Sequence, residues 1–215
     1  MSVDLVASLV FAGCIAIYAA GLYFGLHHPT HSRRGLVNIW YARWVKHRVV
    51  EEDKLLAVHT LRNLIQAVTF LASTMLITLS VMIGNMGIFS PHPVVSLTTF
   101  KVSDVKYYLI FFIIIFSFLC FLMSLRMFIR LSVLINVDIS GLGDKNVDVE
   151  YLQLNFVEAM NRLTYGLRAI YYLIATITWF ISPYLFMGTT VLITLYLFLY
   201  SDIGLVAKAV PTSVP

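Results

Sequence analysis

The sequence predicts an all-α, polytopic membrane protein: a helical bundle of four transmembrane helices, with a cytoplasmic interfacial amphipathic helix and a Pro-kinked last span. Of its 215 residues, 60% are hydrophobic and 12% are charged, whereas soluble domains are roughly half apolar and about a quarter charged. Four runs contain no Asp, Glu, Lys or Arg, and each approaches or exceeds the about 20 residues that cross a hydrocarbon core: residues 5–32, 63–100, 107–125 and 169–201. This pattern excludes a soluble monomer.

The positions of the basic residues predict the orientation in the membrane. Twelve of the 15 Lys and Arg residues lie in or beside two of the connections between spans, and three lie elsewhere. Cytoplasmic connections are rich in Lys and Arg, so we expect a multi-pass protein of the plasma membrane with both termini outside. The expected single membrane domain, residues 1–215, has spans at about 5–26, 62–89, 107–130 and 167–200, and cytoplasmic connections at 27–61 and 131–166.

The first span and the segment after it differ in character. Gly13, Ala16 and Ala20 place small residues in the first span, and small residues let helices approach closely in lipid. From residue 35 to 59 the chain is amphipathic, with Trp40 and Trp44 one turn apart and basic residues on other faces. This pattern is typical of a helix lying in the interface. We therefore expect Trp40 and Trp44 to anchor it at the depth of the lipid headgroups.

The second span carries a polar stripe. Helical spacing places Gln66, Thr69 and Ser73 on one face with Arg62, and Asn63 and Thr74 lie beside that face. A polar stripe in a membrane helix is expected to face either neighbouring helices, where it forms hydrogen bonds, or a water-filled cavity. We expect the first arrangement.

Two features mark the later spans. Arg126 and Arg130 follow the third apolar run at the inner membrane boundary, where their side chains can reach the headgroups. Pro183 interrupts the last run, which is too long for one upright span. Because proline removes a backbone hydrogen bond, this run forms either one kinked helix or two short legs. We expect the kinked helix, since residues 181–184 include no glycine or charged residue that suits a tight turn.

Several segments together resemble a known family. They are Arg62-Asn63 followed by Phe70-Leu71-Ala72-Ser73-Thr74, then Ser124-Leu125-Arg126, then residues 166–172 with Trp179 and residues 183–187. In these segments the chain resembles the family catalogued as domain of unknown function 599, over roughly residues 40–200. The resemblance implies a four-span membrane fold with no assigned activity.

The sequence contains no pattern typical of an enzyme. The acidic residues lie in predicted loops or near helix ends, whereas metal or acid–base chemistry in a membrane needs grouped ionisable side chains. His27, His28 and His31 are the one histidine cluster, and a solvated turn explains them better than a metal site. We therefore expect no enzymatic activity, no cofactor, no metal and no nucleic-acid partner.

Four arginines remain as candidates for binding. Arg62, Arg126, Arg130 and Arg168 flank the spans and are expected at one cytoplasmic level, where they bind lipid headgroups or another anion. We expect a non-enzymatic membrane subunit that stabilises a larger assembly, whose partners are membrane lipids and other membrane subunits or further copies of itself. The alternative is a homo-oligomeric channel or carrier for small anions, with Arg62, Gln66, Ser73, Thr74 and Arg126 lining its path.

Overall fold

The fold is described by a computed structural model that covers residues 3–27, 32–50, 54–84, 102–135 and 145–202. Every regular element in these ranges is helical: α1 (Val3–His27), α2 (Arg33–Val50), α3 (Lys54–Gly84), α5 (Val102–Leu134), α6 (Lys145–Thr178), α7 (Pro183–Tyr196) and the π-helical turn η2 (Leu197–Asp202). Four stretches are long and apolar enough to cross a membrane: Val3–Gly25, Leu55–Gly84, Val105–Leu134 and Pro183–Tyr200. The predicted all-α membrane bundle is confirmed.

The helix bounds differ from the sequence-based ones mainly at the α2 end of the bundle. α3 begins at Lys54 rather than at residue 62, because Ala57 and Leu61 are fully buried and extend its apolar face by two turns. The amphipathic helix therefore ends at Val50, short of the predicted residue 59. α5 likewise continues to Leu134, since Leu131 is buried beyond the predicted end at residue 130.

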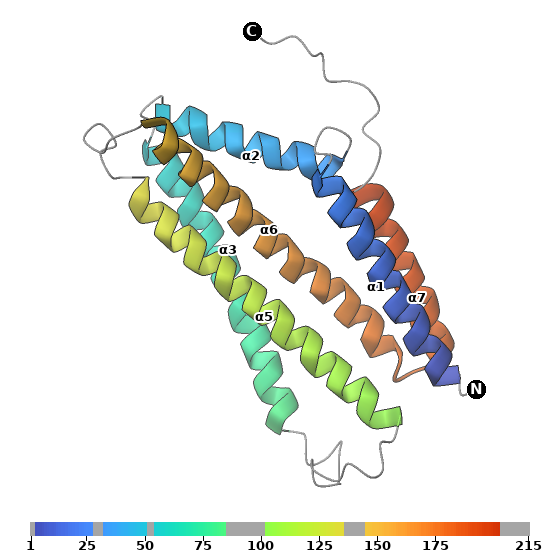
Figure 1. Cartoon of the computed structure of the whole chain (residues 1–215). Coiled ribbons are helices and arrows are strands. Elements are labelled where there is room, and N and C mark those ends of the chain that lie inside the picture. Colours follow the sequence, from blue (N-terminus) through green and yellow to red (C-terminus); the bar gives the residue numbers. More distant parts are fainter. Residues whose placement is uncertain (1–2, 28–31, 51–53, 85–101, 136–144, 203–215) are drawn as a thin grey trace.

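The antiparallel pair of α5 and α6 forms the centre of the bundle (Figure 1). Two buried hydroxyls of α5 donate to backbone carbonyls of α6: Ser117 Oγ to Gly166 O at 3.0 Å, and Ser124 Oγ to Ala159 O at 2.9 Å. Gly166 permits this approach, because a Cβ there would lie 2.5 Å from a ring carbon of Phe121. The absence of a side chain at residue 166 thus sets the spacing of the two helices.

The first core packs α2 and α3 around this pair. α3 lies against α5 with Leu61, Val68 and Met75 buried in a common core. α2 lies against the first half of α6, where Trp44 stacks on Phe156 with ring centroids 5.2 Å apart. α2 is therefore attached to protein along its length.

A second core joins α1 and α7 to the other half of α6. Phe186 of α7 stacks on Trp179 with ring centroids 4.5 Å apart, and Phe11 of α1 lies 5.3 Å from Phe186. Phe11 also meets Tyr172 of α6 edge-on at 5.9 Å. The first helix of the chain thus packs mainly on the last one (Figure 1).

The last apolar run forms two legs, so the prediction of one kinked helix is wrong. α6 ends at Thr178, and α7 returns antiparallel beside it, as the pairs Thr178–Thr189 and Tyr172–Thr194 show with hydroxyl oxygens 3.0 and 3.2 Å apart. Ser182 has extended backbone and accepts from Tyr184 N at 3.3 Å. Because the residue before proline disfavours the helical conformation, Ser182 becomes the N-cap of a new helix and Pro183 its first residue.

This reversal changes where the described chain ends. Asp4, in the first turn of α1, accepts a hydrogen bond from Trp179 Nε1 at 2.9 Å, beside the α6–α7 turn. Tyr200 O instead accepts from Arg33 Nη1, at the start of α2, at 3.0 Å. Val3 and Asp202 therefore lie at opposite ends of the bundle, which does not agree with the expected placement of both termini on one side.

Candidate functional site

Three of the four predicted arginines lie on the outer surface of the bundle. Arg62 on α3 and Arg126 and Arg130 on α5 are all exposed. Tyr107 donates to Met82 O at 2.7 Å, which sets the antiparallel register of α3 and α5 and places Arg62 close to the level of Arg126. Arg130 lies one turn further toward the end of α5. These three guanidinium groups face outward and do not enclose a site within one chain.

Arg168 is deeper, so the expected common level of all four arginines is wrong. The Ser117–Gly166 and Ser124–Ala159 hydrogen bonds place residue 168 opposite residue 115 of α5. That position is eleven residues from Arg126, or about 16 Å along the helix at about 1.5 Å per residue. Arg168 is also 4% exposed, whereas Arg126 lies on the surface.

Two tyrosine rings frame the Arg168 guanidinium. Its central carbon lies 5.7 Å from the ring centroid of Tyr18 on α1 and 5.5 Å from that of Tyr165 on α6. Such cation–π contacts stabilise a cation that has been removed from water. Arg168 thus links α6 to α1 in the interior of the bundle.

A second buried arginine, within the predicted connection 27–61, lies near the start of α2. Arg34 is 8% exposed and donates from Nη2 to Met160 O at 3.4 Å and to the side-chain oxygen of Asn161. Asn161, Tyr165 and Arg168 share one face of α6, because they are spaced four and three residues apart. Both buried guanidinium groups therefore attach to the same face of α6. The spacing of Asn161, Tyr165 and Arg168 at i, i+4 and i+7 is the feature of the sequence that could have indicated this shared face.

The polar stripe of α3 faces away from the rest of the chain. Asn63, Gln66, Thr69, Ser73 and Thr74 are all exposed, whereas the opposite face of α3 packs on α5. The hydroxyls of Thr69 and Thr74 donate to the carbonyls four residues earlier, at 2.8 and 2.9 Å. Among the described residues of one chain, the stripe meets neither of the two expected environments, a neighbouring helix or a cavity.

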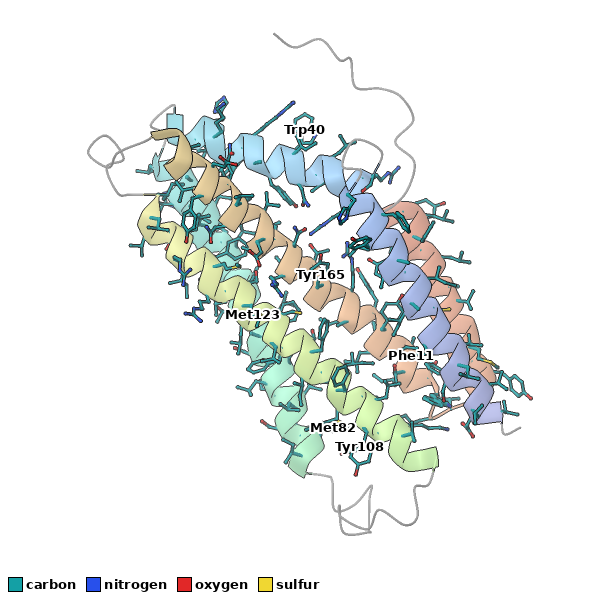
Figure 2. All side chains as sticks on the ribbon, viewed as in Figure 1. Phe11, Trp40, Met82, Tyr108, Met123 and Tyr165 are labelled. Atoms are coloured by element: carbon teal, nitrogen blue, oxygen red, sulfur yellow. The ribbon has the colours of Figure 1, made fainter. Side chains whose placement is uncertain are left out.

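The two tryptophans of α2 have different roles. Trp40 is 66% exposed and points outward, as Figure 2 shows, in agreement with an interfacial position. Trp44 is half-buried and packs on Phe156 beside the first core, so protein covers part of its ring; its role as a headgroup anchor stays a prediction.

An ion pair that was not predicted from the sequence links α1 to α5 at the end of the bundle opposite α2. Lys106 Nζ of α5 lies 3.0 Å from Asp4 Oδ1 of α1 and 5.1 Å from the centroid of the Trp179 ring. Trp179 donates to the same carboxylate oxygen. Asp4, Lys106 and Trp179 are far apart in sequence, so no local spacing indicates this cluster.

The structure contains no grouped side chains suited to metal binding within the described ranges. No set of three His, Cys, Asp or Glu residues lies close enough there to hold a metal ion. Cys14 and Cys120 are free thiols. His28 and His31, from the histidine cluster considered above, lie outside the described residues.

The apolar spans and the two hydrophobic cores, which enclose a few buried polar side chains, define a helical membrane protein. The model of the family described as "Protein of unknown function, DUF599" matches residues 6–203. The chain therefore belongs to this family. Neither a curated protein nor a solved structure matches the chain.

Proposed function

We propose that this protein is a non-enzymatic subunit that stabilises a larger membrane assembly by packing the exposed polar face of α3 on helices outside the chain. The supporting observation is that the buried face of α3 packs on α5 and leaves Gln66, Thr69 and Ser73 outward. Exposed apolar side chains such as Phe70 and Ile77 accompany them. Polar groups that face lipid are unfavourable at membrane depth. Hydroxyl and amide groups instead favour contacts between helices.

The composition of this face suits a helical partner. Thr69 and Ser73 are one turn apart, and small side chains at this spacing let two helices approach closely. Gln66 and Asn63, on the same side and nearer the α2 end, add amides that can donate and accept across an interface. We therefore propose that the partner is another membrane helix.

A second candidate function is a homo-oligomeric channel or carrier for small anions. Arg62 and Arg126 are exposed at nearly the same level on neighbouring helices, and Gln66 and Ser73 continue from Arg62 along α3. These groups could line a path only between copies of the chain. The number and identity of the chains in the assembly therefore separate the two proposals.

We further propose that the protein lies in the plasma membrane with the α2 end of the bundle in the cytoplasm. The described Arg residues at the α2 end include Arg33, Arg43 and Arg62, whereas Lys106 lies at the opposite end with Asp4. Positive charge favours the cytoplasmic side. α6 is not one of the four apolar stretches, but it runs the length of the bundle beside them. We propose that it is a fifth crossing, so that the start of α1 is outside and Asp202 is on the cytoplasmic side.

Site-specific photo-crosslinking in native membranes tests the subunit proposal. A photoreactive residue replacing Ser73 should give an adduct with a different membrane polypeptide, and the same residue replacing exposed Phe180, away from α3, should not. An adduct of twice the chain mass would instead favour the homo-oligomer. Absence of any adduct at Ser73 would contradict both proposals.

A further inference from the structure

Two exposed arginines lie on the same side of the α3–α5 pair. Arg62 of α3 and Arg126 of α5 are both on the surface, and the register of the two helices places them at nearly the same level. Each directly follows a leucine of the packed side of its helix: Leu61 is buried in the first core, and Leu125 packs against that core. In two antiparallel helices, a rotation by one residue from the packed side carries both side chains to the same side of the pair.

No acidic side chain compensates the two charges within the described part of this pair. α3 contains no Asp or Glu, and α5 contains only Asp104, near its opposite end. Among the described residues, neither guanidinium has a hydrogen bond or an ion pair. The axes of packed helices are about 8–10 Å apart, so the two positive charges repel each other. An anion between them removes this repulsion.

The level of the two arginines matches that of a membrane interface. Arg126 is about 30 Å along α5 from Val105, where the apolar stretch begins, at about 1.5 Å per residue, and a hydrocarbon core is also about 30 Å thick. α2 lies at the same level, because Phe156, on which it packs, is opposite residue 127 of α5. Trp40 of α2 is exposed, and tryptophan is enriched at the interface.

We propose that Arg62 and Arg126 together bind the phosphate group of one anionic phospholipid in the leaflet at the α2 end. A planar guanidinium donates in pairs to phosphate oxygens. The site is on the surface, which suits a headgroup that reaches it from the membrane. Exposed Leu122 and Leu119 continue the face of Arg126 toward the middle of the bundle, and an acyl chain of the same lipid lies along them.

The charge of the whole headgroup determines the preference. A choline group would bring a further positive charge to two uncompensated arginines, whereas a glycerol group would not. The inference goes beyond the proposed function, because lipid binding is a property of the single chain and needs no partner polypeptide. It also differs from the second candidate function, in which Arg62 and Arg126 contact a free anion.

A lipid competition with the full chain in detergent tests this proposal. The purified protein is incubated with equal amounts of phosphatidylglycerol and phosphatidylcholine that carry the same acyl chains, purified again, and its bound lipid is quantified by mass spectrometry. We expect the parent protein to retain phosphatidylglycerol about tenfold better, because hydrogen bonds to charged groups are stronger than those between neutral groups. Equal retention of the two lipids would overturn the proposal without any variant.

Inorganic phosphate distinguishes a lipid from a free anion. Excess phosphate at constant ionic strength should not displace phosphatidylglycerol, because it lacks an acyl chain that contacts Leu119 and Leu122. Displacement would overturn the lipid proposal and favour the free anion of the second candidate function.

Three variants and a control locate the site. Arg62→Gln and Arg126→Gln should each remove most of the preference, so the second replacement in the double variant should change little. Both residues are exposed, and circular dichroism should show unchanged helix content. Arg162→Gln is the matched control, because Arg162 lies on α6 and pairs with Glu158 at 3.0 Å; it should keep the preference. Independent, additive losses at Arg62 and Arg126 would overturn the shared site, as would an unchanged preference in the double variant.

Discussion

Gly166 is the residue on which the central helix pair most directly depends. The Phe121 ring occupies the space that any side chain at residue 166 would need, and the Gly166 carbonyl accepts the buried Ser117 hydroxyl. Two independent contacts of the α5–α6 interface therefore meet at one residue. Glycine permits both because it has no Cβ.

We expect Gly166→Ala to destabilise the bundle by about 1–3 kcal/mol, the usual effect of adding a methyl group to a packed interior. Thermal unfolding in detergent, followed by circular dichroism, measures the change. Gly188→Ala is the matched control, because a Cβ there has no atom within 4 Å. Gly166→Ala with Phe121→Leu should regain part of the loss; equal melting of Gly166→Ala and Gly188→Ala would contradict the steric explanation.

At the scale of single elements, α2 is a helix attached to protein that also carries features of an interfacial helix. Trp44 and Tyr41 both contact Phe156 of α6, with centroids 5.2 and 5.8 Å away. Trp40, one turn from Trp44, is exposed. One tryptophan therefore stabilises the attachment of α2, and the other is free to contact lipid headgroups.

Trp44→Ala should loosen α2, whereas Trp40→Ala should not. We expect amide hydrogen exchange across Arg33–Val50 to become about tenfold faster in Trp44→Ala, equivalent to about 1.4 kcal/mol of lost protection. The matched Trp40→Ala variant should exchange like the parent protein when both are in detergent. Faster exchange in Trp40→Ala alone would show that α2 is held by lipid rather than by α6.

The α6–α7 turn brings Thr178 of α6 beside Thr189 of α7, and this proximity can be tested with a disulfide. The Thr178 and Thr189 hydroxyl oxygens are 3.0 Å apart, whereas in one continuous helix they would be separated by about 16 Å at about 1.5 Å per residue. Thr178→Cys with Thr189→Cys, in a chain whose Cys14 and Cys120 are replaced by Ala, should form a disulfide under mild oxidation.

Mass measurement before and after reduction detects this disulfide. The control pair is Thr178→Cys with Leu192→Cys, because Leu192 is an exposed residue of α7. We expect no intramolecular disulfide in this pair. A reduced Thr178–Thr189 pair after oxidation would support the kinked single span.

For the whole molecule, the reversal after α6 predicts an odd number of crossings. With cysteines added one at a time to a cysteine-free chain, Ile181→Cys in the turn should react with an impermeant maleimide added to intact cells. Tyr200→Cys, in η2 after the end of α7, should react only after the membrane is opened. Both residues are exposed in the structure. Labelling of Tyr200→Cys in intact cells would contradict the five-crossing orientation.

The sequence predicted the membrane helices better than their arrangement, for physical reasons. Hydrophobic runs are a local property, so they indicated the all-α membrane bundle correctly. The direction of the chain after Thr178 depends on whether α7 packs on α1 and α6, which Phe11, Tyr172 and Phe186 determine across the full length of the chain. Spacing along one helix cannot reveal that.

The same distinction explains which site residues were missed. Lys106 and Asp4 were each visible as isolated charges, yet their ion pair exists only because α1 and α5 come together at the end of the bundle. Arg168 appeared to begin a span, because the apolar run follows it. α6 is continuous from Lys145 to Thr178, however, so Arg168 lies well inside a helix whose earlier turns also pack in the bundle.

The packing of α1 on α7 has a consequence for biosynthesis. The ribosome makes α1 first and α7 last, so Phe11 cannot meet Phe186 until translation of the described chain is nearly complete. α1 must therefore stay in the membrane without its main helical neighbour while α2, α3, α5 and α6 are inserted. A premature stop codon before Pro183 would leave α1 permanently without that neighbour, and the nascent bundle would present an unfinished surface to the membrane quality-control proteases.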